Sequence, residues 1–79
     1  MTIKVRFFAS LRDATGSPGM ELPATGVSTV ADVWAAAAGG MALPGNTLAA
    51  INMEYVAFAA AVADGDEVAF FPPVTGGGR

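Results

Sequence analysis

The sequence predicts an α+β fold in which about five strands form one sheet and one main helix covers one of its faces. Three observations support this class. Apolar residues alternate with a period of two near both ends of the chain, a segment with helical spacing lies between them, and Gly, Pro and Asp mark the turns. The length of 79 residues suits a single domain.

The first strand is predicted at residues 2–8, where three apolar residues alternate with two basic ones. Phe8 interrupts this alternation and places an aromatic ring on the polar face. It is either an edge aromatic covered by a loop or an anchor for a partner. Residues 10–14 are compatible with one helical turn, and residues 20–22 form a short strand that ends at Pro23.

The main helix is predicted to begin after Thr29, which can cap the helix together with Asp32 three residues later. Apolar residues then follow at helical spacing and define one stripe, and Gly39-Gly40 ends the helix. Trp34 belongs to this stripe, so we expect it in the core; a role in stacking on a ligand is the weaker alternative.

The second half of the chain predicts three more strands, at residues 48–51, 55–56 and 67–71. A tight turn at residues 52–54 separates the first two, and Asp64-Gly65-Asp66 is a turn before the last. We interpret the acidic residues of that turn as solvated, because the ligand pattern of a calcium loop is absent.

In the last strand Phe70 shares a face with Val68, whereas Phe71 lies on the opposite face. A single helix leaves one face of the sheet free for solvent or a partner. If the first and last strands are neighbours, Phe8 and Phe71 both lie on this open face, where an apolar patch indicates an interaction site.

Composition excludes several function classes. The net charge is −3 and no cluster of basic residues is present, which argues against nucleic acid. The sequence has no Cys, which excludes thiolate chemistry, and no His, which is the commonest general base and metal ligand, so we expect no metal site. The remaining candidates for catalysis are carboxylates, Lys4, Tyr55 and hydroxyls. No apolar stretch approaches the ~20 residues of a membrane helix. We expect no membrane association and a cytoplasmic location.

The chain divides into a domain at residues 1–71 and a flexible C-terminal tail at residues 72–79. The Pro72-Pro73 pair ends strand pairing and stiffens the start of the tail. The glycines at residues 76–78 are not followed by a helix, so they do not form a phosphate-binding loop. The tail is either a slim arm that inserts its terminal carboxylate into an ATP-using partner or a segment with no role.

Residues 64–77, DGDEVAFFPPVTGG, resemble the C-terminal signature of the small-subunit family of molybdopterin synthase, which are ubiquitin-like sulfur carriers. Residues 3–9 with Leu11-Arg12 are similar to the first strand of the same family, and residues 48–52 fit a later strand. The resemblance spans nearly the whole chain and is most specific in the tail.

The resemblance implies a β-grasp fold with a mixed sheet, and a non-catalytic subunit that binds no cofactor itself. An E1-like adenylating enzyme would use ATP to activate Gly77, next to Gly76, and a sulfurtransferase would supply sulfur for a thiocarboxylate. The large subunit of molybdopterin synthase would then receive the tail. The implied partner-binding residues are Phe71, Phe8, Arg12, Tyr55, Pro72, Pro73, Val74 and Thr75.

One departure from the family is that Gly78 and Arg79 follow Gly77, whose carboxylate is therefore in a peptide bond. Either these residues are removed, or Gly78 takes over after loss of Arg79, or they are not native, or the protein no longer carries sulfur. Three other functions stay open. They are a ubiquitin-like modifier joined to lysines through its glycine, a sulfur carrier for another pathway such as that of thiamin, and a β-grasp binding module with an inert tail.

Overall fold

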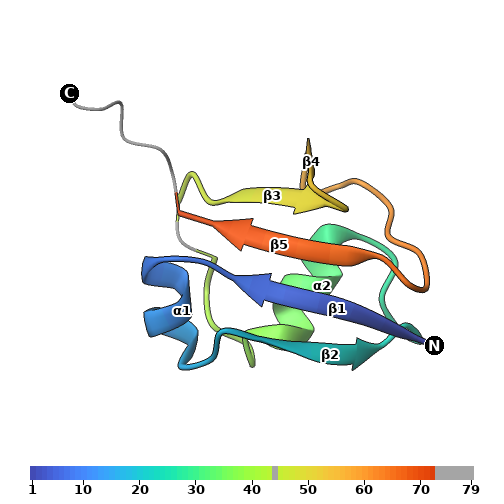
Figure 1. Cartoon of the computed structure of the whole chain (residues 1–79), viewed down its shortest axis with the longest axis horizontal. Helices are drawn as coiled ribbons and strands as arrows, with labels where there is room; N and C mark the ends of the chain where they lie inside the picture. Colours follow the sequence, from blue (N-terminus) through green and yellow to red (C-terminus); the bar gives the residue numbers. More distant parts are fainter. Residues whose placement is uncertain (44, 73–79) are drawn as a thin grey trace.

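A computed structural model describes residues 1–43 and 45–72 of the chain (Figure 1). The described residues form two helices and five strands, in the predicted order. They are β1 (Thr2–Phe7), α1 (Ser10–Thr15), β2 (Gly19–Pro23), α2 (Val30–Ala37), β3 (Leu48–Ile51), β4 (Glu54–Val56) and β5 (Glu67–Phe71). Five predicted bounds shift by one residue. β1 ends one residue earlier than predicted, α1 ends one residue later, β2 is longer by one residue at each end, and β4 begins one residue earlier, at Glu54.

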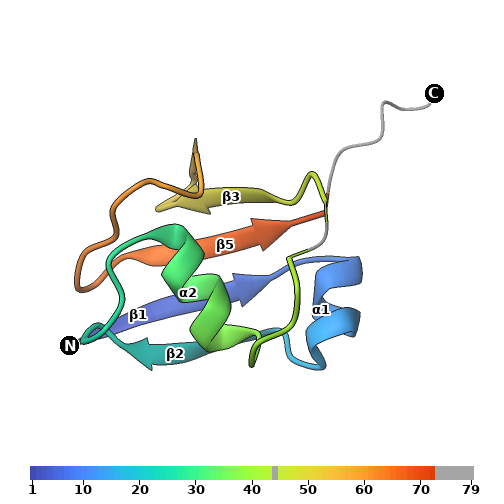
Figure 2. The same cartoon turned by 180° about the vertical axis from the view of Figure 1, so that it is seen from behind.

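One sheet contains all five strands in the order β2-β1-β5-β3-β4. β1 and β5 are parallel and the other neighbours are antiparallel, so the sheet is mixed. Parallel neighbours need a connection that returns over a face of the sheet, and α2 lies across that face (Figure 2). No helix within residues 1–43 and 45–72 is long and apolar enough to cross a membrane.

The core lies between α2 and the sheet. The predicted alternation holds, because Ile3, Val5 and Phe7 of β1 are buried while their neighbours are exposed. The Trp34 ring packs edge-on against Phe7 and Phe70, with centroid distances of 5.8 and 5.1 Å. Its indole N–H donates to a backbone carbonyl in the following loop at 2.9 Å. The core position expected for Trp34 is therefore confirmed.

The start of α2 carries the predicted capping box. The Thr29 hydroxyl accepts a hydrogen bond from the Asp32 N–H at 3.3 Å. The Asp32 carboxylate in turn accepts from the N–H groups of Ser28 and Thr29, at 2.9 and 3.1 Å. These bonds favour the ionised acid and lower the pKa of Asp32, with the bond from Ser28 as the largest cause. This end of the helix is thus set by local sequence.

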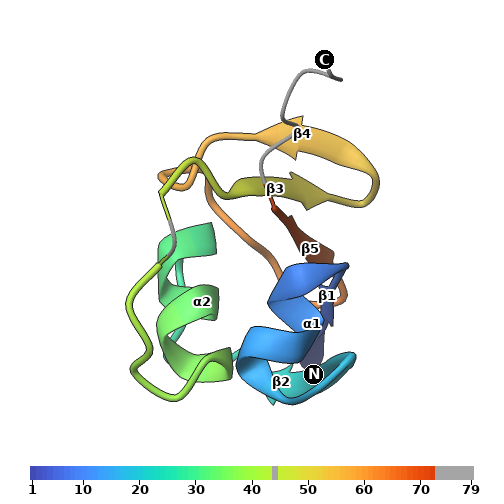
Figure 3. The same ribbon diagram turned by 90° about the vertical axis from the view of Figure 1, so that its left-hand side faces the viewer.

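The second face of the sheet has no helix over it in the described part of the chain. Figure 3 shows the sheet from one end, with α2 on one side and the other side uncovered. The six-residue helix α1 follows β1 and buries Leu11. The open face predicted from the presence of a single main helix is therefore present.

Candidate functional site

The candidate site is the open face where β1, β5, β3 and β4 lie side by side. Successive side chains of a strand point to opposite faces of the sheet. The residues that alternate with the core residues therefore point to the open face. The register places Arg6 opposite Ala69 and Ala50 opposite both Ala69 and Tyr55. Side chains from both ends of the chain and from its middle therefore meet on one surface.

Phe8, Phe71 and Tyr55 form an aromatic cluster on this face. The rings of Phe8 and Phe71 stack with centroids 4.8 Å apart and planes only 5° from parallel. Tyr55 lies 5.8 Å from Phe71 with its ring tilted by 59°. The Phe8 N–H donates to the Phe70 carbonyl at 3.1 Å, which extends the pairing of β1 with β5 and brings the two phenylalanines together.

The cluster remains accessible to a partner. Phe8 is 37% exposed and Tyr55 is 67% exposed, while Phe71 is half-buried between them. Offset or tilted aromatic pairs stabilise each other modestly and still present apolar surface. The Phe8 ring is covered on one side by Phe71 and stays partly exposed, and its role as an anchor for a partner remains a prediction.

A hollow of about 400 Å³ lies beside the aromatic cluster. Its small lining side chains belong to Ala50, which is only 3% exposed, and to Ala69. Ala50 is buried although it does not belong to the core cluster under α2. The other lining residues are larger and comprise Arg6, Phe8, Met53, Tyr55, Glu67 and Phe71.

Two charged residues in the lining neutralise each other. A guanidinium nitrogen of Arg6 lies 3.5 Å from a carboxylate oxygen of Glu67. The guanidinium carbon also lies 5.7 Å from the centre of the Phe8 ring, within the range of a cation–π contact. Because the pair is partly exposed, it contributes little stability. It leaves the hollow without a net charge from its own walls.

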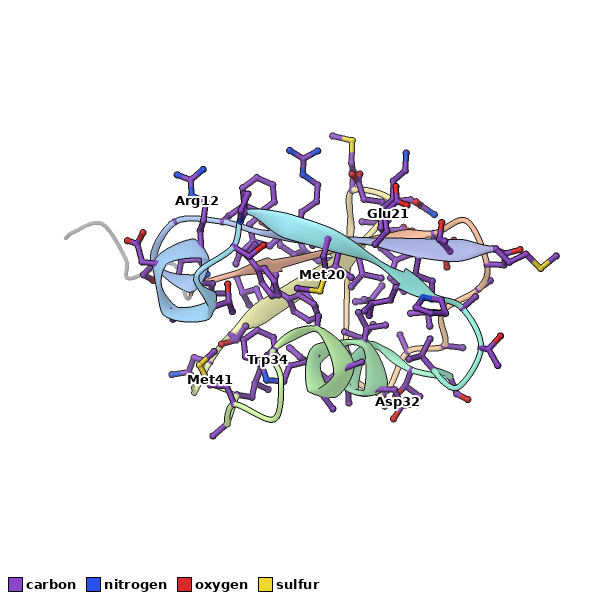
Figure 4. The ribbon with its side chains drawn as sticks, turned by 90° about the horizontal axis from the view of Figure 1, so that it is seen from below. Arg12, Met20, Glu21, Asp32, Trp34 and Met41 are labelled. Carbon is purple, nitrogen blue, oxygen red and sulfur yellow. The ribbon has the colours of Figure 1, made fainter. Side chains whose placement is uncertain are left out.

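Arg12 lies on α1 and is exposed. Figure 4 shows its side chain pointing to the same side of the sheet as Glu21, away from Trp34 and Asp32. It is therefore on the side of the open face, but it has no ring contact or ion pair with the aromatic cluster. Of the predicted partner-binding residues that precede the tail, Phe8, Tyr55 and Phe71 form the aromatic cluster and Arg12 stands apart.

The tail begins where the cluster ends. Pro72 follows Phe71 directly and is half-buried. Pro73, Val74, Thr75, Gly76 and Gly77, which the sequence predicts as binding or reactive residues, lie outside the described residues. Their roles remain predictions from the sequence.

Sequence reasoning missed Met53, Arg6 and the two alanines of the hollow. Met53 is 92% exposed at the tip of the hairpin between β3 and β4. Met53 could have been found from the sequence, because it is an apolar residue in a predicted tight turn. Ala50 and Ala69 could not be found from the sequence, because only the pairing of the strands determines which side chains lie beside them.

The described residues of this face offer apolar surface and no cluster of metal ligands. In the described ranges no three His, Cys, Asp or Glu side chains lie close enough to hold a metal ion. Since the whole sequence lacks His and Cys, the side chains that remain as candidate nucleophiles or bases are carboxylates, Lys4, Tyr55 and hydroxyls.

Comparisons with known proteins identify the family of the chain. The model of the ThiS family matches residues 5–77. The molybdopterin synthase sulfur carrier subunit of Escherichia coli K12 is 45% identical over 84 aligned positions, covering 95% of this chain and 99% of that protein. The expected family resemblance is therefore confirmed.

Solved structures confirm the fold. The small archaeal modifier protein 1 of Haloferax volcanii matches with a TM-score of 0.78 and 30% identity, covering 98% of this chain and all of that one. A subunit in the complex of subunits 1 and 2 of the Helicobacter pylori molybdopterin-converting factor shares the fold, with a TM-score of 0.66 and 22% identity over 98% of this chain and 100% of that one. The chain therefore belongs to the ThiS family, as a β-grasp sulfur carrier of the molybdopterin synthase type.

Proposed function

We propose that the chain carries sulfur as a thiocarboxylate on Gly77 and that its open face docks on the proteins that load and unload this sulfur. In this proposal residues 1–71 are the recognised domain and residues 72–79 are the reactive tail. The observation that carries the proposal is the position of the aromatic cluster, which ends at Phe71, one residue before the tail begins. A protein that binds this cluster is placed to receive the tail.

Loading of the tail requires two steps. A carboxylate oxygen of Gly77 attacks the α-phosphate of ATP in an E1-like adenylating enzyme, and pyrophosphate leaves. Sulfide, which a thiol reductant releases from the persulfide of a sulfurtransferase, then attacks the acyl carbon, and AMP leaves with the thiocarboxylate formed. The ATP site belongs to the partner, so this chain needs no bound cofactor, and we place the reaction in the cytoplasm.

Unloading takes place on the large subunit of molybdopterin synthase, where sulfur passes to the pterin precursor. Support comes from the Escherichia coli relative, which is a subunit of that enzyme by name, and from the Helicobacter pylori protein, which is in a complex of two subunits. We assign contacts with the partner to Phe8, Arg12, Tyr55 and Phe71. The tail residues from Pro72 to Gly76 would occupy the channel that leads to its active site.

The two residues after Gly77 define a condition for this function. A carboxyl group in the peptide bond to Gly78 has no free oxygen to adenylate. The sulfur-carrying form therefore has to be cleaved between Gly77 and Gly78, and this cleavage is part of the proposal. A chain ending at Gly77 is the form that the adenylating enzyme accepts.

The test is the intact mass of the protein after incubation with the adenylating enzyme, the sulfurtransferase, a sulfur source and ATP. The chain ending at Gly77 should gain the mass difference between sulfur and oxygen. The full chain should gain it only where Gly78-Arg79 has been lost, and a chain ending at Gly76 is the control that should stay unmodified. Absence of the shift in the chain ending at Gly77 would overturn the proposal.

A second candidate is a protein modifier that is joined to lysines of other proteins. The match to the small archaeal modifier protein 1 favours it, because that structure is similar over almost the entire chain. The two functions share adenylation and differ in the product. Lysine-linked conjugates of the chain in cells, abolished when the chain is truncated after Thr75, would support the modifier, whereas a free thiocarboxylate supports the carrier.

A further inference from the structure

Met53 occupies a backbone conformation that its side chain disfavours. β3 and β4 pair up to Ile51 and Glu54, so the connecting loop has two residues. Its residues Asn52 and Met53 have φ angles of 50° and 72°. Two-residue loops with positive φ at both positions strongly prefer Asn followed by Gly. Asn52 fits this preference, but Met53 stands where glycine would be free of strain.

The turn is held in place by bonds to the neighbouring strand. The Asn52 N–H donates to the Glu67 carbonyl at 2.8 Å, and the Asn52 side-chain oxygen accepts from the Glu67 N–H at 3.0 Å. Its side-chain amide also donates to the Asp66 carboxylate at 3.0 Å. A strained residue persists when its surroundings determine its conformation. These bonds fix Asn52, the residue directly before Met53 in the same turn.

The Met53 side chain contributes almost nothing to the fold that would offset this strain. It is 92% exposed, so it is not packed against the core. It nevertheless lines the hollow that also contains Phe71. An exposed apolar side chain kept at a strained position, beside an apolar hollow, indicates a selected contact with another molecule.

The reach of the tail restricts which molecule can make this contact. Gly77 is six residues beyond Phe71, and six residues extend at most about 22 Å. A protein that holds Gly77 in its active site therefore lies close to the end of β5. The hollow extends from Phe71 to Met53, so the same protein can cover both of its ends.

We infer that Met53 is a binding residue for the large subunit of molybdopterin synthase, which inserts an apolar side chain into the hollow between Met53 and the aromatic cluster. The inference rests on the proposed function. The occupant is apolar because Ala50 and Ala69 form small apolar walls and three aromatic rings surround them. Arg6 and Glu67 are paired with each other and do not require a charged group.

The experiment compares the affinity for the large subunit from the same organism with thermal stability. It uses wild type and Met53→Gly, each as the full chain and as the chain ending at Gly77. Glycine relieves the strain, so the Tm should be unchanged or rise by up to about 5 °C. Loss of the side chain should weaken binding by about tenfold. If Met53 is a binding residue, Met53→Gly therefore weakens binding without lowering thermal stability.

Two variants serve as controls. Met53→Leu keeps an apolar side chain of similar volume and should bind within about threefold of wild type. Asn46→Gly replaces another residue with positive φ, 64°, in a loop that does not line the hollow, and should leave the affinity unchanged. Together they separate loss of the contact from the effect of glycine itself.

The outcomes are distinct. If Met53→Gly binds as tightly as wild type, or Met53→Leu binds as weakly as Met53→Gly, the inference is overturned while the proposed function stands. If wild type ending at Gly77 neither binds the large subunit nor forms a thiocarboxylate, the proposed function is overturned, and the inference with it.

Discussion

The two faces of the sheet use the same residue type for opposite purposes. Phe7 and Phe70 are 2% and 0% exposed and pack under α2, whereas their immediate neighbours Phe8 and Phe71 stack on the open face. Each pair is adjacent in sequence and separated only by the alternation of strand side chains. The alternation of side chains along each strand therefore decides which phenylalanine stabilises the fold and which is available to a partner.

The difference also concerns what each face contacts. The apolar side chains of the covered face pack against Trp34 and the other apolar residues of α2. The open face gathers three aromatic rings, Met53 and a hollow without covering them. Burying this apolar surface in a complex would be favourable at about 25 cal/mol per Å² of apolar area, before the costs of association.

The largest expected effect separates Phe70 from Phe71. Phe70→Ala removes a fully buried ring and should lower the free energy of unfolding by about 3–5 kcal/mol. For 79 residues at about 0.05–0.15 kcal/mol each, total stability is about 4–12 kcal/mol, so this variant approaches unfolding. Phe71→Ala removes a half-buried ring and should lower the free energy of unfolding by only about 1 kcal/mol. Urea unfolding followed by Trp34 fluorescence measures both values.

The same pair of variants also tests the assignment of the faces. Phe71→Ala should weaken binding to the large subunit, while retaining the far-ultraviolet circular dichroism of wild type. Equal losses of stability for Phe70→Ala and Phe71→Ala would mean that the open face contributes to the fold as the covered face does, and the comparison would fail.

An intermediate effect is expected at Asn52, which attaches the hairpin of the open face to β5. Asn52→Ala removes two side-chain hydrogen bonds and places a Cβ-bearing residue without a local hydrogen bond at φ 50°. The free energy of unfolding should fall by about 1–2 kcal/mol. Denaturant unfolding checks this value.

Asn52→Gly is the matched control for that prediction. It loses the same side-chain bonds but tolerates the positive φ, so its stability should lie between those of wild type and Asn52→Ala. If both variants are as stable as wild type, the bonds between the turn and β5 contribute nothing, and the rigid placement of Met53 loses its basis.

The smallest effect concerns the covered face, where Asp32 caps α2. Its pKa is lowered in the folded state, so ionisation of Asp32 stabilises the fold above the unfolded pKa, near 3.8. This contribution is lost as the pH falls below that value and through the lower folded pKa. We therefore expect wild type to exceed Asp32→Ala in unfolding free energy near neutral pH, with a difference that shrinks below about pH 4.

Urea unfolding of both proteins between pH 7 and pH 2 measures this difference. Asp32→Asn is a useful second variant, because its amide oxygen can still accept a bond but does not titrate. A difference between wild type and Asp32→Ala that stays constant down to the lowest pH would show that the charge of Asp32 has no part in the cap.

The sequence by itself determined the elements and their faces. Alternation in residues 2–7 and 67–71 gave the buried and exposed sides of both strands, and Thr29 with Asp32 marked the start of α2. These features depend on interactions within a few residues, which a linear pattern records. The chemistry of the tail was likewise expected from its glycines and from the family resemblance.

Only the tertiary structure decided which of the exposed residues meet. Phe8 and Phe71 stack because β1 and β5, from opposite ends of the chain, are parallel neighbours. The hollow exists because β3 and β4 place Ala50 and Tyr55 beside them, and Met53 gains its position from the bonds between Asn52 and the start of β5. Strand pairing is selected by burial and hydrogen bonding over the whole sheet, so no local segment of the sequence contains it.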